Sequence, residues 1–349
     1  MKISGVETRI LHEGYAQLEL KQRRLKSLIR TMFCVSFPFK KAMKHIYLLA
    51  AFIIFSCSRN DNSSITIIPS SPEPESQNPP EEGVVNGLPE ISNVGFDFST
   101  ADVAGWELLW EDNFDSDLSE WNIWKGGAFN EELQLYQEDN LYVEGGYLFI
   151  EQLRETASGA NNPYDAITKS FNFTSGRIET KELYNPSQQG TLRIAARIKL
   201  PAGEGLWPAF WTFGDPWPTQ GEIDIMEFRG SSTNEYSTNF FYGNEPNISL
   251  TDPSITTYTH NANTDLTAAF HVFDMVWTPN NLIVSLDGAV VHTFSSNEFQ
   301  YVSDLFTKNE KVVLNLAVGG AFFNGMNLNV NEIPDQSFLV VDWVKIYKQ

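Results

Sequence analysis

The chain has 349 residues, enough for one large all-β domain or for two ordinary domains. Its formal net charge is -20, and ten of its 24 Lys and Arg residues lie within residues 1–45. The rest of the chain is strongly acidic, which excludes nucleic acid and other polyanions as expected partners. Only Cys34 and Cys57 occur, both ahead of the expected folded region, so we expect no disulfide in the domain.

The first recognisable segment is MKHIYLLAAFIIFSC, which ends at Cys57. A short basic start, an apolar run and a small residue before the cysteine are typical of a secretory signal that is too short to span a bilayer. The segment resembles a bacterial lipoprotein signal, so we expect residues 1–57 to be an N-terminal extension and signal peptide with lipidation at Cys57. A simple membrane anchor or a chance apolar stretch stays open, as does a translation start at Met43.

Residues 58–90 are rich in Ser, Pro, Asn and Glu and poor in aromatic residues. Such a segment cannot bury enough apolar surface to offset its ordering entropy, and we expect an extended linker. All nine tryptophans lie between Trp106 and Trp343, which places the folded domain in residues 91–349. The protein is expected to be exported, to be held at a bacterial outer membrane or cell surface by its lipid alone, and to be a monomer.

The folded part reads as strands throughout. Residues 191–200 alternate apolar and polar side chains, which predicts a strand with one buried face. A local basic patch of Arg193, Arg197 and Lys199 stays open as an exception to the acidic character of the domain. Asp287 and Gly288 separate two alternating segments, the pattern of a tight hairpin. The runs KVVLNLAVGG and SFLVVDWVKIYK are apolar on both faces and predict central strands. With no long amphipathic helix after residue 105, we predict a β-sandwich or β-barrel of one domain.

The segment GEIDIMEF, residues 221–228, carries three acids among apolar residues. In a regular strand Glu222 and Asp224 share one face, but Glu227 falls on the other face. One β-bulge near Ile225 and Met226 would return Glu227 to the acidic face and turn Met226 and the following phenylalanine inward. The spacing therefore predicts a bulged strand with three carboxylates on one face.

Crowded carboxylates repel each other, so a purely structural face gains nothing from them. Retaining glycoside hydrolysis requires two carboxyl groups of unequal proton affinity about 5 Å apart. In that chemistry Glu222 attacks the anomeric carbon, Glu227 stays protonated because its neighbours' charges raise its pKa, and Asp224 orients the nucleophile. A solvated strand edge or a cation site are the alternatives that the residues alone leave open.

An ordered set of motifs surrounds these acids: WEDNFD, NEELQLYQ, SGRIETK, ARIKLPAGEGLWPAFW, GEIDIMEF, LNLAVGG and VDWVKIY. Over roughly Trp106 to Lys348 the chain resembles glycoside hydrolase family 16. Its E-x-D-x-x-E spacing resembles the bulged branch of the family, which includes laminarinases as well as agarases and carrageenases. Within that branch, LPAGEGLWPAFW, NEELQ and AVGG resemble β-1,3-glucanases, the laminarinase-like members. The resemblance implies a β-jelly-roll sandwich of two curved antiparallel sheets with a concave carbohydrate cleft. It also implies the catalytic roles given above for Glu222, Asp224 and Glu227.

The resemblance further implies residues that bind the substrate. Trp211 would stack on a sugar ring, and Asn130, Glu131 and Arg177 would hydrogen-bond hydroxyl groups. Trp207 is either core or subsite, and Asn239 stands where laminarinases usually carry a cleft histidine. The chain also differs from the family at positions where sugar subsites are built. Gly127, Ala128 and Phe129 replace a Gly-Trp-Gly type sequence, and Phe322 and Phe323 stand where laminarinases often have a tryptophan.

No cofactor is implied for catalysis, but some family members bind a structural calcium ion. The matching positions are Asn113, Gly146 and Asp342. Calcium favours carboxylate ligands, so Asn113 would weaken such a site.

Together these expectations describe an endo-acting β-1,3-glucanase or mixed-linkage β-1,3-1,4-glucanase whose partner is a polysaccharide. A galactan hydrolase of the agarase or carrageenase kind is the enzymatic alternative, although an acidic protein suits neutral glucans better than sulfated galactans. A non-catalytic carbohydrate-binding lipoprotein is the alternative from another class.

Overall fold

The structure, a computed structural model, describes residues 84, 85 and 87–349. The predicted signal of residues 1–57 with Cys57, and most of the predicted linker of residues 58–90, lie outside these residues. Within the described part, no helix combines the length and the apolar character needed to cross a membrane.

Two sheets contain most of the strands. The larger has 10 strands: β3 (Glu107–Asp112), β5 (Gln134–Tyr136), β6 (Leu141–Glu144), β7 (Tyr147–Leu153), β10 (Phe173–Ser175), β12 (Leu192–Lys199), β17 (His271–Trp277), β18 (Asn281–Leu286), β19 (Ala289–Ser295) and β21 (Gln336–Lys348). The smaller has 7 strands: β4 (Trp121–Ile123), β11 (Arg177–Thr180), β13 (Leu206–Phe213), β14 (Glu222–Phe228), β15 (Glu235–Phe241), β16 (Tyr258–Asn261) and β20 (Lys311–Val318).

The remaining elements are short. Two hairpins consist of β1 (Val84–Val85) with β2 (Leu88–Pro89) and of β8 (Ala157–Asn162) with β9 (Asp165–Phe171). The helices of the described residues have four residues or fewer: α2 (Pro186–Gln189), α3 (Pro253–Thr256), α4 (Val302–Leu305) and the 3-10 turns η1 (Glu138–Asn140), η2 (Ala321–Phe323) and η3 (Val330–Glu332). The predicted lack of a long helix after residue 105 is confirmed.

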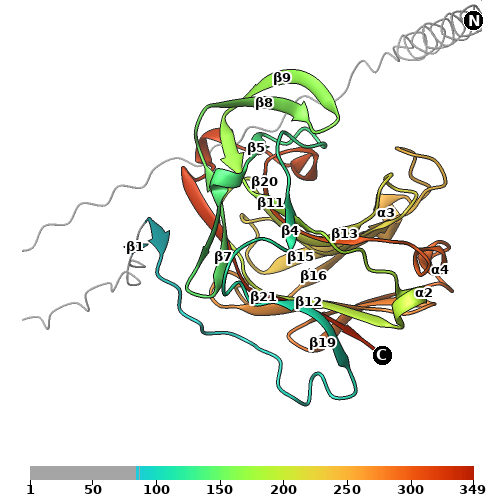
Figure 1. Ribbon diagram of the computed structural model, residues 1–349. Helices are drawn as coiled ribbons and strands as arrows, with labels where there is room; N and C mark the ends of the chain where they lie inside the picture. Colours follow the sequence, from blue (N-terminus) through green and yellow to red (C-terminus); the bar gives the residue numbers. More distant parts are fainter. Residues whose placement is uncertain (1–83, 86) are drawn as a thin grey trace, which may run out of the picture. The chain divides into compact units, whose positions relative to one another are not determined.

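The two sheets pack face to face, as the two layers of Figure 1 show. The smaller sheet has the strand order β16-β15-β14-β13-β20-β11-β4, and the main order of the larger is β19-β18-β17-β12-β21-β7-β10-β5. Fully buried side chains from both sheets meet between the layers, such as Ile194 and Phe273 from the larger sheet and Phe210 and Phe228 from the smaller. The predicted β-sandwich is confirmed, and its core lies between the sheets.

The hairpin prediction at Asp287 and Gly288 is also confirmed. β18 and β19 pair across these residues, whose φ angles of 51° and 75° are those of a tight two-residue turn. The Asp287 carboxylate accepts a hydrogen bond from the backbone N–H of Val272 at 2.9 Å and contacts Nδ1 of His271 at 2.7 Å. The turn is therefore tied to β17 as well as to its own strands.

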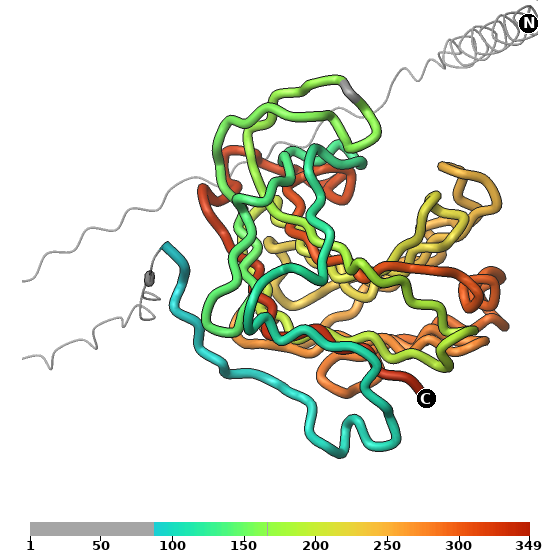
Figure 2. The backbone as a smooth tube through the Cα atoms, in the orientation of Figure 1, coloured from blue at the N-terminus to red at the C-terminus, as the bar shows by residue number. Residues whose placement is uncertain are grey.

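The prediction of one buried face for residues 191–200 is half wrong. Leu192, Ile194, Ala196 and Ile198 lie in the core as expected, but the opposite face of β12 is covered too. Residues 93–102 run along the outer side of the larger sheet, where the chain can be followed in Figure 2. The sequence pattern could not show this cover, because it comes from a segment about 100 residues away.

The cover also takes Arg193 and Arg197 out of the local basic patch that the sequence had left open. Arg193 pairs with Asp274 at 2.9 Å, and Arg197 pairs with Asp342 at 2.6 Å. The Arg197 guanidinium also donates to the Phe96 carbonyl at 2.7 Å and lies over the Phe270 ring. Both arginines are neutralised inside the protein and offer no cationic surface to a polyanion.

The folded part begins slightly before residue 91. Leu88 and Ile91 pack against a small cluster of Phe149, Phe270 and Val340 on the larger sheet. The last residues of the predicted linker therefore belong to the domain.

Arg197→Met should destabilise the domain strongly. Methionine keeps the apolar stem but leaves the Asp342 carboxylate and the Phe96 carbonyl without their partner, and breaking a buried pair in this way costs about 3–5 kcal/mol. Urea denaturation would measure the loss. Lys348→Met is the matched control, because Lys348 and Glu107 form a solvent-exposed pair at 3.1 Å and such pairs contribute less than about 1 kcal/mol. Equal losses in the two variants would contradict this account.

Candidate active site

The central strand of the site is β14, and it carries the predicted bulge. Against β15, Asp224 pairs with Asn239 and Glu227 pairs with Ser237, so Ile225 and Met226 together oppose the single residue Thr238. The register against β13 shifts at the same place. Ile223, Ile225, Met226 and Phe228 all lie in the core. The predicted bulge and the inward direction of Met226 and Phe228 are confirmed.

The bulge leaves the three acids on the face of the smaller sheet that is turned away from the core. Asp224 is buried, with 5% of its surface exposed, whereas Glu222 and Glu227 are partly exposed. Burial raises the pKa of all three carboxyls, and the charge of Glu227 further raises the pKa of Glu222. Groups that interact in this way titrate as a unit, so the cluster holds protons near neutral pH.

The cause of the raised pKa of Glu227 differs from the prediction. Burial raises it most, and the Trp207 N–H and the charge of Arg229 oppose that effect. The neighbouring carboxylates push mainly on Glu222 and Asp224. Which of the two glutamates holds the proton during catalysis therefore stays a prediction.

Trp207 was predicted to be either a core residue or part of a sugar subsite, and the structure shows it partly buried with both its N–H and its ring bound to protein groups. Its Nε1 donates to Oε1 of Glu227 at 3.2 Å, and its ring stacks on Phe322 at 4.5 Å between centroids. Arg229 lies over the other ring of that pair, Phe322, at 3.6 Å and donates to its carbonyl at 2.8 Å. The stack of Trp207, Phe322 and Arg229 positions an N–H donor at Glu227. Phe322, at which the chain departs from the family, is the central residue of this stack.

Trp211 and Arg177 lie in a second stack. The guanidinium carbon of Arg177 is 4.1 Å from the ring centre of Trp124 and 4.8 Å from that of Trp211. Arg177 is buried and donates to Glu179 at 2.7 Å. The structure thus gives Arg177 aromatic and acidic partners within the protein, and its predicted contact with a sugar hydroxyl stays a prediction, as does sugar stacking on Trp211.

The predicted hydroxyl ligands Asn130 and Glu131 lie in an exposed turn with φ angles of 60° and 58°. The next residue, Glu132, is buried, accepts from Gln134 at 2.6 Å, and has a pKa that burial raises to about 7. The sequence prediction missed Glu132, although it shares the period of two with Gln134 and Tyr136.

A hydrogen-bond chain connects Glu132 to Trp211. The Tyr136 hydroxyl lies 3.2 Å from Glu132, Asn315 donates to that hydroxyl at 3.1 Å, and Trp211 donates to Asn315 at 2.7 Å. Asn315 therefore orients the Trp211 ring from the neighbouring strand β20.

Asn239 lies on β15, where it is buried and pairs with Asp224 of β14. Its side-chain oxygen accepts a hydrogen bond from the Phe240 N–H at 2.8 Å.

The residues predicted to hold calcium do not fit that role. Asp342 directs its carboxylate to Arg197, so its charge is already balanced. Asn113 is neutral and Gly146 would contribute only a carbonyl. Among the described residues, no three His, Cys, Asp or Glu side chains gather as a metal-binding group.

Another buried acid, Glu310, interacts with Glu222 and was also missed by the sequence prediction. Only 1% of its surface is exposed, and it accepts from the Thr212 hydroxyl at 2.5 Å. Burial, opposed by the Thr212 hydrogen bond and aided by the charge of Glu222, raises the pKa of Glu310 to about 8. The sequence pattern hides this residue, because a glutamate at the start of a strand is ordinarily solvated.

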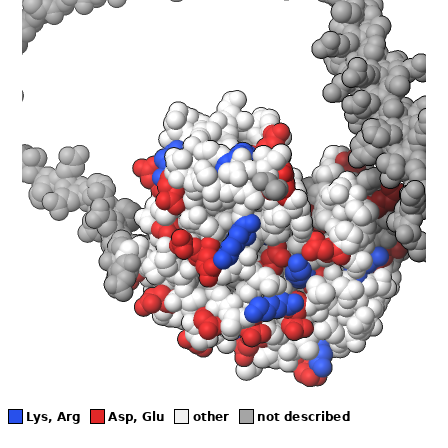
Figure 3. All heavy atoms as spheres, turned by 45° about the horizontal axis from the view of Figure 1, so that its top comes forward, with Lys and Arg blue, Asp and Glu red and all other residues white. Residues whose placement is uncertain are grey.

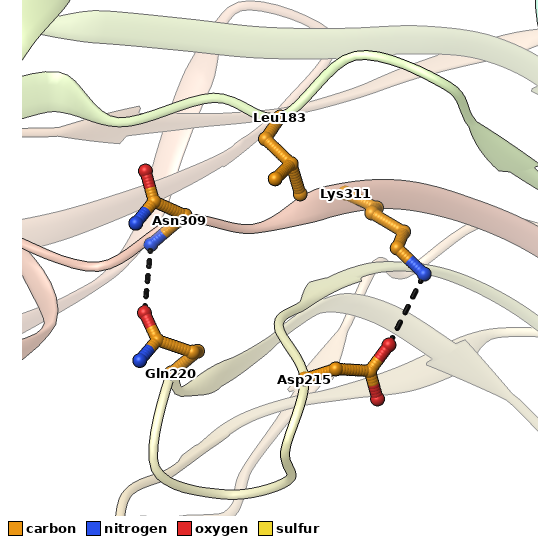
Figure 4. Close-up of a pocket in the computed structure, with 5 residues that line it drawn as sticks. All are labelled: Leu183, Asp215, Gln220, Asn309 and Lys311. Carbon is orange, nitrogen blue, oxygen red and sulfur yellow. Dashed lines mark hydrogen bonds and ion pairs between the residues drawn. The ribbon is translucent and has the colours of Figure 1, made fainter.

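A pocket of about 340 Å³ opens near Glu310, between the loop that leads into β14 and the start of β20. Figure 4 shows its lining, with Lys311 paired to Asp215 and the Asn309 N–H bonded to Gln220. None of Glu222, Asp224 and Glu227 lines this pocket, so we assign it no catalytic role.

Glu310→Gln should weaken the pH dependence of stability. The folded state holds the Glu310 proton up to about pH 8, whereas an exposed glutamate has a pKa of 4.5. The contribution of Glu310 to the free energy of unfolding is thus fully present below pH 4.5 and is lost as the pH rises towards 8. Glutamine keeps an acceptor for Thr212 but cannot ionise, so the fall in unfolding free energy between pH 5 and pH 8 should shrink by at least about 1 kcal/mol.

Urea denaturation at the two pH values would measure this change. The exposed Glu182→Gln is the matched control and should behave as the wild type. An unaltered pH dependence in Glu310→Gln would show that Glu310 is ionised in the folded protein.

Comparisons with known proteins agree with this geometry. Residues 135–343 match the family model described as glycosyl hydrolases family 16. A glucan endo-1,3-beta-glucosidase of Cryptopygus antarcticus is 34% identical over 245 residues, which cover 65% of this chain and 86% of the relative. Glucan endo-1,3-beta-glucosidase A1 of Niallia circulans is 28% identical over 274 residues, which cover 71% of this chain but 38% of that longer relative.

The same fold is found among solved structures. The X-ray structure of an endo-beta-1,3-glucanase from Pyrococcus furiosus matches with a TM-score of 0.58 at 31% identity, and the match covers 70% of this chain and 94% of that one. The predicted jelly-roll sandwich is thereby confirmed. The family model covers more than half of the chain, and the chain therefore belongs to glycosyl hydrolases family 16.

Proposed function

We propose that this glycoside hydrolase is an endo-acting β-1,3-glucanase that retains the configuration of the anomeric carbon. The bulge in β14 carries this proposal, because it places Glu222, Asp224 and Glu227 together on one face of the smaller sheet while their apolar neighbours face the core. Double displacement requires one ionised and one protonated carboxyl, and the repulsion between Glu222 and Glu227 disfavours the state in which both are ionised.

In the first step, the Glu222 carboxylate attacks the anomeric carbon while the Glu227 carboxyl gives its proton to the glycosidic oxygen. The bond to the leaving sugar breaks, and a covalent glycosyl ester on Glu222 forms. In the second step, Glu227 takes a proton from water, which attacks the same carbon and releases Glu222. The Trp207 N–H holds Glu227 in place through both steps and stabilises its ionised form.

Asp224 and Glu310 are two further carboxyl groups that interact with Glu222. Burial raises the pKa of Asp224 well above its usual range, and the charges of Glu227, Glu222 and Glu310 add to that effect. Removing every proton from such a cluster is unfavourable, so one carboxyl remains a proton donor while another acts as nucleophile.

The substrate class rests on two observations. Both relatives described above are named as enzymes of β-1,3-glucan, and their aligned regions cover most of the domain. The protein is acidic, and on the face shown in Figure 3 its basic residues lie singly beside acidic ones. A neutral glucan meets no repulsion there, whereas a sulfated galactan would.

A substrate panel tests the proposal. Release of reducing oligosaccharides should be highest with laminarin, lower or equal with lichenan, and absent with agarose and carrageenan. Glu222→Gln keeps the size of the side chain but removes the nucleophile, so it should lower kcat by at least about a thousandfold. Activity on the galactans alone would refute the glucanase assignment, and binding without cleavage by the wild type would favour a carbohydrate-binding protein.

The acid/base role of Glu227 has its own test. Glu227→Ala should lose most of its turnover on laminarin, because the departing sugar then receives no proton. With a dinitrophenyl β-1,3-gluco-oligosaccharide, whose phenolate leaves without a proton, the glycosyl enzyme should still form, and azide should raise turnover by attacking it without general-base help. The product should be a β-glycosyl azide, which nuclear magnetic resonance would identify. An α-glycosyl azide would contradict retention, and failure of azide to rescue would contradict the role of Glu227.

A further inference from the structure

The cleft face of the smaller sheet leads from the acids to an edge strand. Starting at β14, the strand order is β13, β20, β11 and β4, and Trp124 directly follows β4. Four strand spacings of about 4.8 Å place this edge roughly 19 Å from β14. A polymer that binds at the acids and crosses the strands in this direction therefore reaches Trp124.

Trp124 is held in a fixed position at this edge. Its Nε1 donates to the Gly127 carbonyl at 3.1 Å, and its ring packs on the same Arg177 guanidinium that lies over Trp211. The stack of Trp124, Arg177 and Trp211 makes the edge continuous with the part of the cleft where we expect sugar stacking.

Two exposed aromatic residues extend this line beyond the sheet. Phe129 comes from the turn before β5, and Tyr164 comes from the tip of the β8–β9 hairpin, which projects past the two sheets in Figures 1 and 2. Their rings stack on each other at 6.4 Å with an interplanar angle of 22°, and each meets Trp124 edge-on, at 6.5 Å and 6.3 Å. Two distant segments thus build one aromatic cluster.

The cluster is open to solvent. The exposed fractions are 50% for Phe129 and 72% for Tyr164. Burial, followed by the charges of Asp215 and Glu179, raises the pKa of Tyr164. Exposed rings that contact each other and adjoin a cleft are typical of a binding site.

We propose that Trp124, Phe129 and Tyr164 form an aromatic site that binds distant sugar units of the same glucan chain that is cleaved between Glu222 and Glu227. The apolar face of a pyranose suits an aromatic ring, and the Tyr164 hydroxyl adds a hydrogen-bonding group. The inference rests on the proposed function, and it assigns a length preference to the enzyme: long chains reach the aromatic site and short ones do not.

Kinetics on β-1,3-gluco-oligosaccharides of increasing length test the inference. The double variant Phe129→Ala/Tyr164→Ala should raise KM about tenfold for the polymer and for long oligosaccharides, because it removes two stacking rings. KM for the shortest cleaved oligosaccharides and kcat for all substrates should stay within about twofold of the wild type, because the acids are unchanged.

Two further variants separate sugar stacking from general effects on the hairpin. Ile167→Ala removes an exposed apolar side chain of β9, with an exposed fraction of 69%, and should leave every KM unchanged. Tyr164→Phe keeps the ring and should retain most of the affinity for long chains. An equal rise in KM for short and long substrates, or no rise for any, would overturn the proposal.

Direct binding keeps this test independent of the proposed function. In the Glu222→Gln background, the affinity for laminarin, lichenan and agarose is compared with and without the Phe129→Ala/Tyr164→Ala pair. A drop of about tenfold for at least one polymer supports the aromatic site even if the wild type proves to cleave a different glycan. Unaltered affinity for every polymer that the parent variant binds would refute the site while leaving the proposed catalysis intact.

Discussion

One extra residue in β14 is the constraint on which the active site depends. A regular strand would turn Glu227 into the sandwich interior beside Ile223 and would leave Met226 on the cleft face. A carboxylate without partners in an apolar core costs several kcal/mol, and an exposed methionine forfeits its burial. The bulge removes both penalties at once. Its backbone is held from β15, where the Thr238 hydroxyl donates to the Asp224 carbonyl at 2.6 Å.

The crowded acids require support from residues that lie far apart in the sequence. Glu227 has the Trp207 N–H and the charge of Arg229, while Glu310 interacts with Glu222 and holds the Thr212 hydroxyl. The cluster gains no stability from its own charges, since burial and repulsion raise its pKa values. The surrounding fold keeps it in place, and the cluster's tendency to retain a proton is the property that acid/base catalysis uses.

Much of this architecture could be predicted because its causes are local. Alternation of side chains predicts strands, Asp287 and Gly288 adopt the positive φ angles that their hairpin requires, and the parity of Glu222, Asp224 and Glu227 indicates the bulge. The position of Trp207 could not be predicted locally, because its ring stacks on Phe322, which lies in η2 about 115 residues later in the chain. Arg193 and Arg197 show it more clearly, because they alternate like solvent-facing residues and yet are buried.

The sequence by itself determined the strand periods, the acid spacing and the motifs that mark the family. Only the tertiary structure decided that residues 93–102 cover β12, that Asp342 pairs with Arg197, and that Glu132 and Glu310 are buried acids. It also brought Phe129 and Tyr164 to Trp124. The physical reason is that periodicity follows from the backbone of a single strand, whereas burial, ion pairing and pKa depend on groups that other strands bring near.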